Sequence, residues 1–337
     1  MGKIRMDIKK KGIFFTFLAI TITAVFILVF TPPSDISLKK DNQAIRTKIS
    51  SVDNYVNDLE TRYFEYALKA SAHKAILSLI FYINTTGSYI TDFDSAFSEV
   101  AINGTINSVP IDSITGKKIM ENNTLNNWSA KITQTAFDTL NVNTTIYFVN
   151  LTASQTKPWN IDSILIVNFT VNSSVAYWKK GNVSISASIG IEGFHDPYYI
   201  VKTNKAYTNQ IKRSSVEFNK WNVSKVREHL RNGTYVHWEN SDAPSFLMRF
   251  TNTITPSSCC GIESLVNPNK ISPSDQIESY VDYLFWTHVY QTQCTLLYNT
   301  TNPSKGIGLW DEFKFFKLDI NHAVKYNITD ADAIRTC

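Results

Sequence analysis

Residues 45–80 read IRTKIS SVDNYVNDLE TRYFEYALKA SAHKAILSLI, and apolar or aromatic side chains recur in them at alternating steps of four and three. Only His73 interrupts this apolar seam, which consists of Ile45, Ile49, Val52, Val56, Leu59, Tyr63, Tyr66, Ala70, His73, Leu77 and Ile80. A repeat of about 3.5 residues places such positions on one stripe of a helix. Because residues 36–81 contain neither Pro nor Gly, we expect one long helix over residues 36–83.

Two partners could cover this seam: a second copy in a coiled-coil stalk, or the chain's own sheet. The third alternative is a shorter helix and hairpin. The second half carries further apolar bulk beside the seam, at Phe64, Ala67, Leu68, Ala72, Ala75, Ile76, Leu79 and Phe81. A wider apolar arc suits burial in a domain better than a two-stranded contact does. We therefore expect a stalk near residues 36–60 and packing into a head near 61–83, with His73 as an interior histidine rather than a ligand.

The segment before the helix predicts a membrane anchor. Residues 13–30 (IFFTFLAITITAVFILVF) carry no charge, and at about 1.5 Å per residue they reach close to the thickness of a bilayer core. Pro32 and Pro33 end this stretch, because proline has no N–H to continue a helix. A cleaved secretory signal is the alternative, but this stretch is longer than usual and lacks a small-x-small site.

Charge gives the orientation of that anchor. Five of the 33 basic residues lie within residues 1–12, which hold one acid, so the rest carries 28 basic and 28 acidic residues. The positive-inside rule then predicts a single-pass protein of the cell membrane, with a cytoplasmic N-terminus and residues 34–337 extracellular. A neutral remainder also argues against nucleic-acid binding, which needs a basic face.

Lys9-Lys10-Lys11-Gly12 stands directly before the apolar run. This arrangement resembles the class III signal of archaeal type IV pilin-like membrane-anchored surface proteins. The resemblance implies cleavage after Gly12 with the apolar helix retained, and a first helix whose second half packs on the chain's own sheet. The expected partners are the lipid bilayer and, through the long helix, further copies or other surface proteins.

Asparagine sequons agree with an exterior location. The chain has thirteen Asn-x-Ser/Thr sites, about twice the number that its Asn, Ser and Thr content gives by chance, and such a site needs a surface position and the right compartment. An Asn- and Thr-rich composition could also produce the excess. The candidate glycosylation sites are Asn84, Asn103, Asn122, Asn127, Asn143, Asn150, Asn168, Asn172, Asn182, Asn222, Asn232, Asn299 and Asn327.

Four cysteines, Cys259, Cys260, Cys294 and Cys337, lie in the last quarter of the chain. An even count outside the cell favours disulfides. A bond between Cys259 and Cys260 would strain the peptide that they share, so we expect each of them to pair with Cys294 or Cys337. The spacing does not match a zinc site.

The head is expected to combine a sheet with a mixed C-terminal part. Residues 84–130 are rich in turn residues and predict loops with short elements. Period-two alternation predicts antiparallel strands at 144–151, 161–178 and 183–191, a turn at 179–182, and a fourth strand at 198–202. Residues 204–337 are expected to be mixed α/β with helix near 214–230. The fold class is α+β: a transmembrane helix, a long helix after a proline break, a sheet over 84–203 and a disulfide-containing C-terminal part.

No motif identifies an enzyme, a cofactor or a metal, so we name no catalytic, cofactor-binding or metal-ligating residue. The nucleophile elbow, zinc-protease, P-loop, dinucleotide and EF-hand patterns are absent from the sequence. We expect an extracellular glycoprotein with a structural or adhesive surface role, such as a pilin-like component. The alternatives are a membrane-tethered binding module for a sugar, peptide or solute, and an envelope hydrolase.

Overall fold

The structure is a computed structural model in which described residues alternate with gaps. It describes Thr21 and residues 34–271, 279–287, 295–297, 312–313, 316–328 and 334–336. Gly12, Cys294, Asn299, Cys337 and, apart from Thr21, the predicted anchor at 13–30 lie outside them. Within those ranges, no helix is both long enough and apolar enough to cross a bilayer.

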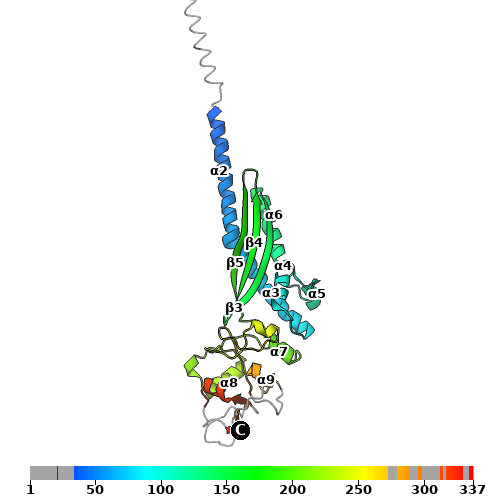
Figure 1. Cartoon of the computed structure of the whole chain (residues 1–337), viewed down its shortest axis with the longest axis vertical. Helices are drawn as coiled ribbons and strands as arrows, with labels where there is room; N and C mark the ends of the chain where they lie inside the picture. Colours follow the sequence, from blue (N-terminus) through cyan, green and yellow to red (C-terminus); the bar gives the residue numbers. More distant parts are fainter. Residues whose placement is uncertain are drawn as a thin grey trace, which may run out of the picture.

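The predicted long helix is confirmed. Helix α2 (Ser34–Asp58), a π-helical turn η1 (Leu59–Tyr63) and helix α3 (Phe64–Thr86) follow one another without a break and form the rod in Figure 1. Gly87 ends the rod with φ +73°, and its N–H donates to the carbonyl of Ile83. A left-handed residue at this position is the usual helix stop because glycine adopts it without steric cost.

The turn η1 changes which face of the helix is buried. In a π turn each hydrogen bond spans one residue more than in an α-helix, and here the N–H of Phe64 donates to the carbonyl of Leu59. Upstream, the buried positions Val52, Val56 and Leu59 follow the predicted seam. Downstream, burial moves forward by one position, onto the second apolar set. Phe64 is buried, whereas Tyr63 of the seam is exposed.

Two expectations about this helix are wrong. His73 is exposed rather than interior, and its ring lies 5.0 Å from that of Phe194. Burial on the helix also begins at Val52, earlier than the expected end of a stalk near residue 60. The part of α2 that stands clear of the head is therefore shorter than predicted, and residues 42–47 are all exposed.

Residues 84–140 hold more helix than predicted. They form α4 (Phe93–Asn103), a short hairpin of β1 (Thr105–Ile106) and β2 (Val109–Pro110), α5 (Ile111–Thr115) and α6 (Leu125–Leu140). The Asp92 side chain accepts from the N–H groups of Asp94 and Ser95 at the start of α4. Thr124 caps α6 in the same way, through the N–H of Asn127. These caps satisfy N–H groups that have no partner inside the helix.

A three-stranded antiparallel meander packs on these helices. Its strands, in spatial order, are β3 (Asn143–Lys157), β4 (Asn160–Asn172) and β5 (Tyr177–Gly190). The predicted turn at 179–182 is instead a bulge within β5. The chain reverses at 173–176, where the N–H of Ser173 donates to the carbonyl of Ala176.

One face of this sheet is covered and the other is open. The inward residues of β4 are Ile161, Ser163, Leu165, Val167, Phe169 and Val171, all buried. Helix α3 covers β4 and β5, and α4 and α6 lie against β3. In Figure 1 the helical rod runs along the sheet, and no helix lies over the opposite face. This is the half-buried sheet that the alternation predicts.

The C-terminal part has little regular structure within the described residues. Its elements are α7 (Pro197–Lys202), η2 (Phe218–Lys220), α8 (Val223–Asn232), η3 (Leu247–Phe250), α9 (Asp282–Phe285), β6 (Thr295–Leu297), β7 (Lys317–Asp319), α11 (Ile320–Lys325) and β8 (Ile334–Thr336). The fourth strand predicted at 198–202 is wrong, because Asp196 caps a helical turn there and Pro197 takes its first position. Strands β6, β7 and β8 form a second antiparallel sheet in the order β7-β6-β8.

The C-terminal part and the preceding part, which holds the rod and the β3–β4–β5 sheet, share one apolar core. The N–H of Ile90 donates to the carbonyl of Phe250 at 3.0 Å, and the rings of Phe93 and Phe250 lie 5.1 Å apart. The Lys205 ammonium donates to the carbonyl of Thr85, next to the end of α3. The C-terminal part is thereby fixed to the end of the rod that lies away from α2 (Figure 1).

Candidate functional site

A buried arginine ties together three segments of the C-terminal part. Arg249 and its partners Asp196 and Asp282 are all fully buried. Nη1 of Arg249 donates to Asp196 at 2.7 Å and to Asp282 at 2.8 Å, and Nη2 donates to the carbonyl of Ile262. Burial raises the pKa of Asp282 to about 6, although the charge of Arg249 opposes this shift. Removing either partner would leave an uncompensated buried charge.

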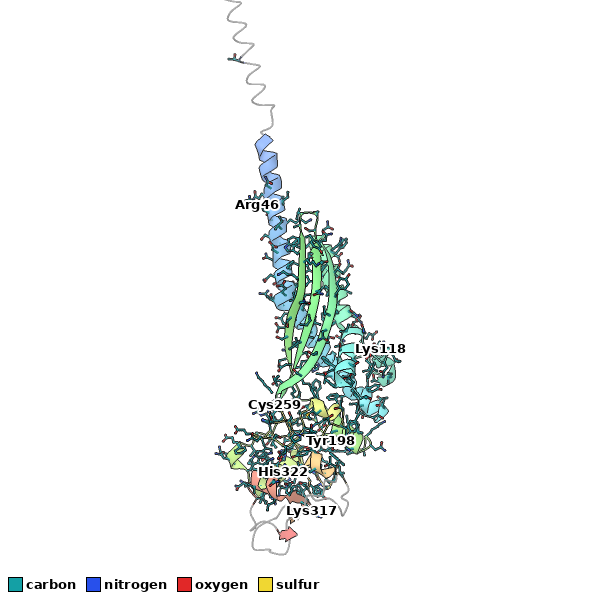
Figure 2. All side chains as sticks on the ribbon, in the orientation of Figure 1. Arg46, Lys118, Tyr198, Cys259, Lys317 and His322 are labelled. Atoms are coloured by element: carbon teal, nitrogen blue, oxygen red, sulfur yellow. A yellow bond between two sulfur atoms is a disulfide. The ribbon has the colours of Figure 1, made fainter. Side chains whose placement is uncertain are left out.

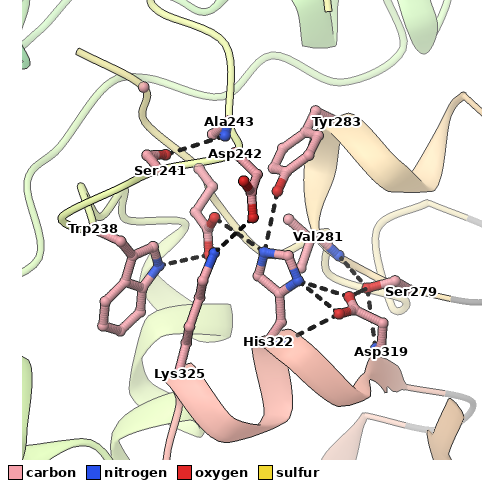
Figure 3. Close-up of polar contacts among 12 residues, drawn as sticks. Trp238, Ser241, Asp242, Ala243, Ser279, Val281, Tyr283, Asp319, His322 and Lys325 are labelled. Atoms are coloured by element: carbon pink, nitrogen blue, oxygen red, sulfur yellow. Dashed lines mark hydrogen bonds and ion pairs between the residues drawn. The ribbon is translucent and has the colours of Figure 1, made fainter. Parts of the chain in front are cut away.

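A second buried cluster is centred on His322 (Figure 3). Its Nδ1 lies 2.8 Å from a carboxylate oxygen of Asp319, and its Nε2 lies 3.3 Å from a carboxylate oxygen of Glu263. The hydroxyl of Tyr283 lies 3.1 Å from the same Nε2. Trp238 Nε1 donates to the other oxygen of Glu263 at 2.7 Å. The Nε2 contact with Glu263 is an ion pair rather than a hydrogen bond. Two carboxylates this close to a buried ring favour its charged form, the imidazolium.

The titration of the cluster follows from this geometry. Burial disfavours the imidazolium, but Glu263 and Asp319 outweigh burial and raise the pKa of His322 to about 10. Burial raises the pKa of Asp319, but the hydrogen bond from His322 lowers it. The net result is a pKa of about 2. A histidine that keeps its proton at neutral pH cannot act as a general base there. Since His322 is also 3% exposed, we interpret both clusters as ties that hold irregular segments together.

The predicted disulfide pairing is wrong for two of the cysteines. Cys259 and Cys260 are bonded to each other. Bonding between neighbours was expected to strain the shared peptide, but here the two residues lie in a turn (residues 258–260) that brings both sulfurs to one side. The Sγ of Cys260 lies 3.1 Å from the carbonyl oxygen of Gln155 in β3. In Figure 2, Cys259 lies where the strands meet the C-terminal part.

The same junction carries a further contact of β3. The side-chain oxygen of Gln155 accepts from the N–H of Leu247, and its amide nitrogen donates to the carbonyl of Pro158. The disulfide turn and the tip of the β3–β4 hairpin are therefore in direct contact. Gly261 follows the disulfide because a Cβ there would meet the carbonyl oxygen of Ala243 at 2.2 Å.

An open groove with aromatic walls lies between the rod and α6. It has a volume of about 460 Å³ and includes Tyr55, Tyr63, Trp128, Ile132 and Leu140. A neighbouring hollow of about 710 Å³ continues it along α2 and shares Ser51, Thr139 and Leu140. Nε1 of Trp128 is buried and has no hydrogen-bond partner in the described part of the chain, so it does not face the groove. A groove with apolar and aromatic walls could hold a ligand or a second polypeptide.

The predicted sequons are spread over the described surface. Nine of the twelve described sites are exposed, namely Asn103, Asn122, Asn143, Asn150, Asn172, Asn182, Asn222, Asn232 and Asn327. Asn84, Asn127 and Asn168 are half-buried. The side-chain oxygen of Asn127 contacts the hydroxyl of Thr124.

Sequence reasoning missed both ionic clusters and the groove. Asp196, Arg249 and Asp282 stand far apart in sequence, and the same holds for Glu263 and His322. The only local signal was an arginine inside the apolar run 246–250 (FLMRF), since an arginine in such a run is buried only when it is paired. In the described ranges, no group of three or more His, Cys, Asp or Glu residues is arranged to hold a metal ion.

Comparison with protein-family models, with curated proteins and with solved structures returns no match for this chain.

Proposed function

We propose that this protein is a membrane-anchored extracellular glycoprotein with a structural or adhesive role, as a pilin-like component of the cell surface. The observation that carries the proposal is the continuous helix from residue 34 to residue 86. Its C-terminal half is buried under a sheet, and its N-terminal end is exposed and points away from the head (Figure 1).

The sequence supplies the other half of the argument. The exposed end of α2 leads back, through Pro32 and Pro33, to the uncharged segment 13–30. A segment of this length and composition is typical of a membrane-spanning helix. A helix that is fixed in a head at one end and follows an apolar segment at the other is suited to holding that head away from a membrane.

Protease digestion of intact cells tests the topology. Residues 34–337 should be cleaved without lysis, and protection until lysis would contradict the proposal. N-terminal sequencing of the membrane-bound protein separates the two kinds of anchor. A start at Ile13 supports the pilin-like route and a start at Met1 or Gly2 supports a plain anchor, whereas a start beyond Phe30 contradicts both.

A second candidate function is a tethered binding module, which the groove beside α6 favours. Its walls include the side chains of Tyr55, Tyr63 and Trp128. Thermal-shift and fluorescence titrations of the full chain with oligosaccharides and apolar peptides would test this candidate. A Tyr63→Ala variant, which removes an exposed aromatic wall of the groove, should weaken any ligand that binds there. Equal affinity in both proteins would remove the groove from consideration as that ligand's site.

A further inference from the structure

Five sequons lie on the open face of the β3–β4–β5 sheet. Side chains alternate between the two faces along a strand, and the buried residues of each strand define the inward set. By this alternation and by the bulges in β3 and β5, the outward set includes Asn143, Asn150, Asn168, Asn172 and Asn182. All are exposed except Asn168, which is half-buried.

A strand also presents the second half of a sequon on the same face. The hydroxyl residue stands two positions after the asparagine, and residues i and i+2 of a strand share a face. Thr145, Thr152, Thr170 and Ser184 thus lie beside Asn143, Asn150, Asn168 and Asn182. Both residues of the acceptor are exposed at Asn143, Asn150 and Asn182, and both are half-buried at Asn168.

The same face carries apolar side chains that no described element of the chain covers. Tyr147, Val149, Ile164 and Tyr177 are exposed, the two tyrosines by 63% and 59%. Exposed apolar groups gathered on one face indicate that something covers them. The identity of the covering group follows from what lies next to the tyrosines.

Each outward tyrosine stands directly opposite a sequon asparagine. Tyr147 on β3 pairs with Asn168 on β4, and Tyr177 on β5 pairs with Asn172 on β4. Directly opposed residues have Cβ atoms about 4.5–5.5 Å apart. A sugar attached to the asparagine would therefore leave the sheet beside a tyrosine ring, whose apolar face suits the C–H face of a pyranose.

The environment of Asn168 leaves its reactive nitrogen available. Its Oδ1 accepts from the N–H of Asn182 at 2.6 Å, which fixes the amide and uses only the oxygen. N-glycosylation uses the nitrogen, Nδ2, so this hydrogen bond and a glycan are compatible. Gly181 lies beside Asn168, and even a Cβ at Gly181 would stand 3.8 Å from Oδ1, so the bulge does not crowd the amide.

We propose that Asn168 and Asn172 carry N-linked glycans whose first sugar rings lie on Tyr147 and Tyr177, so that sugar rather than protein covers this sheet face. The proposal rests on the extracellular location proposed above. In the transfer, Nδ2 attacks the anomeric carbon of a lipid-phosphate- or lipid-pyrophosphate-linked saccharide. The bond between that carbon and the phosphate oxygen breaks, the amide loses one proton, and the lipid phosphate leaves.

The test compares three tyrosines of similar exposure. Tyr66 on α3 is 67% exposed and lies away from the sheet strands, so it serves as the matched control. The full chain would be produced in a host that glycosylates Asn-x-Ser/Thr sites, and glycopeptide mass spectrometry would give the occupancy of each site. Surface nitration would then be quantified at Tyr66, Tyr147 and Tyr177.

We expect Tyr147 and Tyr177 to be nitrated several-fold more slowly than Tyr66. Asn168→Gln should restore the rate at Tyr147 alone, and Asn172→Gln should restore it at Tyr177 alone. These substitutions keep the amide, and circular dichroism would verify that each variant is folded.

The outcomes separate this inference from the proposed function. A chain with no glycan on any asparagine overturns both the inference and the glycoprotein part of the proposal. Glycans at other sequons but not at Asn168 and Asn172 overturn the inference alone. The inference alone is also overturned if Asn168 and Asn172 carry glycans but Tyr147 and Tyr177 are nitrated as fast as Tyr66.

Discussion

Replacing His322 by Gln should cost the protein about 3–5 kcal/mol at neutral pH, the usual penalty for breaking a buried ion pair from one side. The imidazolium is the shared partner of Glu263 and Asp319, and all three side chains are buried. Glutamine can bond one carboxylate but brings no positive charge. The variant would have to protonate a carboxylate or leave it uncompensated.

The raised pKa of His322 gives a second value for the stabilisation that this ion pair contributes. The difference between the ordinary pKa of 6.5 and about 10 in the folded protein corresponds to about 5 kcal/mol, at about 1.36 kcal/mol per unit. The folded pKa is the higher one, so this stabilisation is fully present below pH 6.5. It is lost as the pH rises through about 10, because the unfolded chain has already released the proton.

Urea denaturation followed by circular dichroism, at intervals between pH 6 and 10, would measure both effects. The free-energy difference between wild type and His322→Gln should be largest near pH 6 and should shrink steadily toward pH 10. The control is His237→Gln, because Nδ1 of this half-buried histidine bonds the carbonyl oxygen of Gly261 rather than a carboxylate. A wild-type advantage that stays constant across the range would refute the assignment of a buried imidazolium.

Three further predictions concern other parts of the head. Arg249→Met should destabilise the protein by about 3–5 kcal/mol in urea melts, because two buried aspartates lose their counter-charge. The control is Lys325→Met, which removes a more exposed ion pair and should change stability by less than about 1 kcal/mol. Gly261→Ala should lower the thermal midpoint sharply, since its Cβ would meet a backbone oxygen at 2.2 Å, and Gly190→Ala, which meets nothing within 4 Å, should not; equal midpoints would contradict the packing at the disulfide turn. Mass spectrometry of unreduced peptides should find an internal bond in the peptide that contains Cys260, and a cross-link to any other cysteine would contradict the pairing.

The long helix was predictable from local information because a Pro- and Gly-free stretch carries a sustained repeat. The change of buried face at Leu59–Tyr63 was not predictable in this way. The sequence holds two apolar registers one residue apart, and only packing against the sheet decides where one replaces the other. His73 fell on the wrong side of that change and was therefore misplaced.

The strands were predictable from alternation, but their ends were not. Lys179-Lys180-Gly181-Asn182 has the composition of a hairpin turn, yet it forms a bulge because Val183 must stay opposite Val167 in the covered face. Helices α4 and α6 were missed because turn residues dominate 84–130. Asp92 and Thr124, which cap the two helices, were present as start signals.

The candidate sites could not have been found from the sequence. The partners of Arg249, and Glu263 as a partner of His322, come from segments that only the fold brings together. Asp319 stands three residues before His322, but that spacing alone does not indicate a buried ion pair. Cys259 and Cys260 were visible, but the turn that allows them to bond was not. Sequons, by contrast, are local signals, and only their arrangement on one sheet face needed the structure.

The single extra residue in η1 sets the direction in which the outer part of the rod faces. One residue corresponds to about 100° of rotation in an α-helix. Deleting one residue from Leu59–Tyr63 would turn the helix upstream of the turn by about this angle relative to α3. Because Val52, Tyr55 and Val56 are buried in the head's core, that rotation would also withdraw them from it. The buried end of α2 therefore holds the outer segment to one orientation.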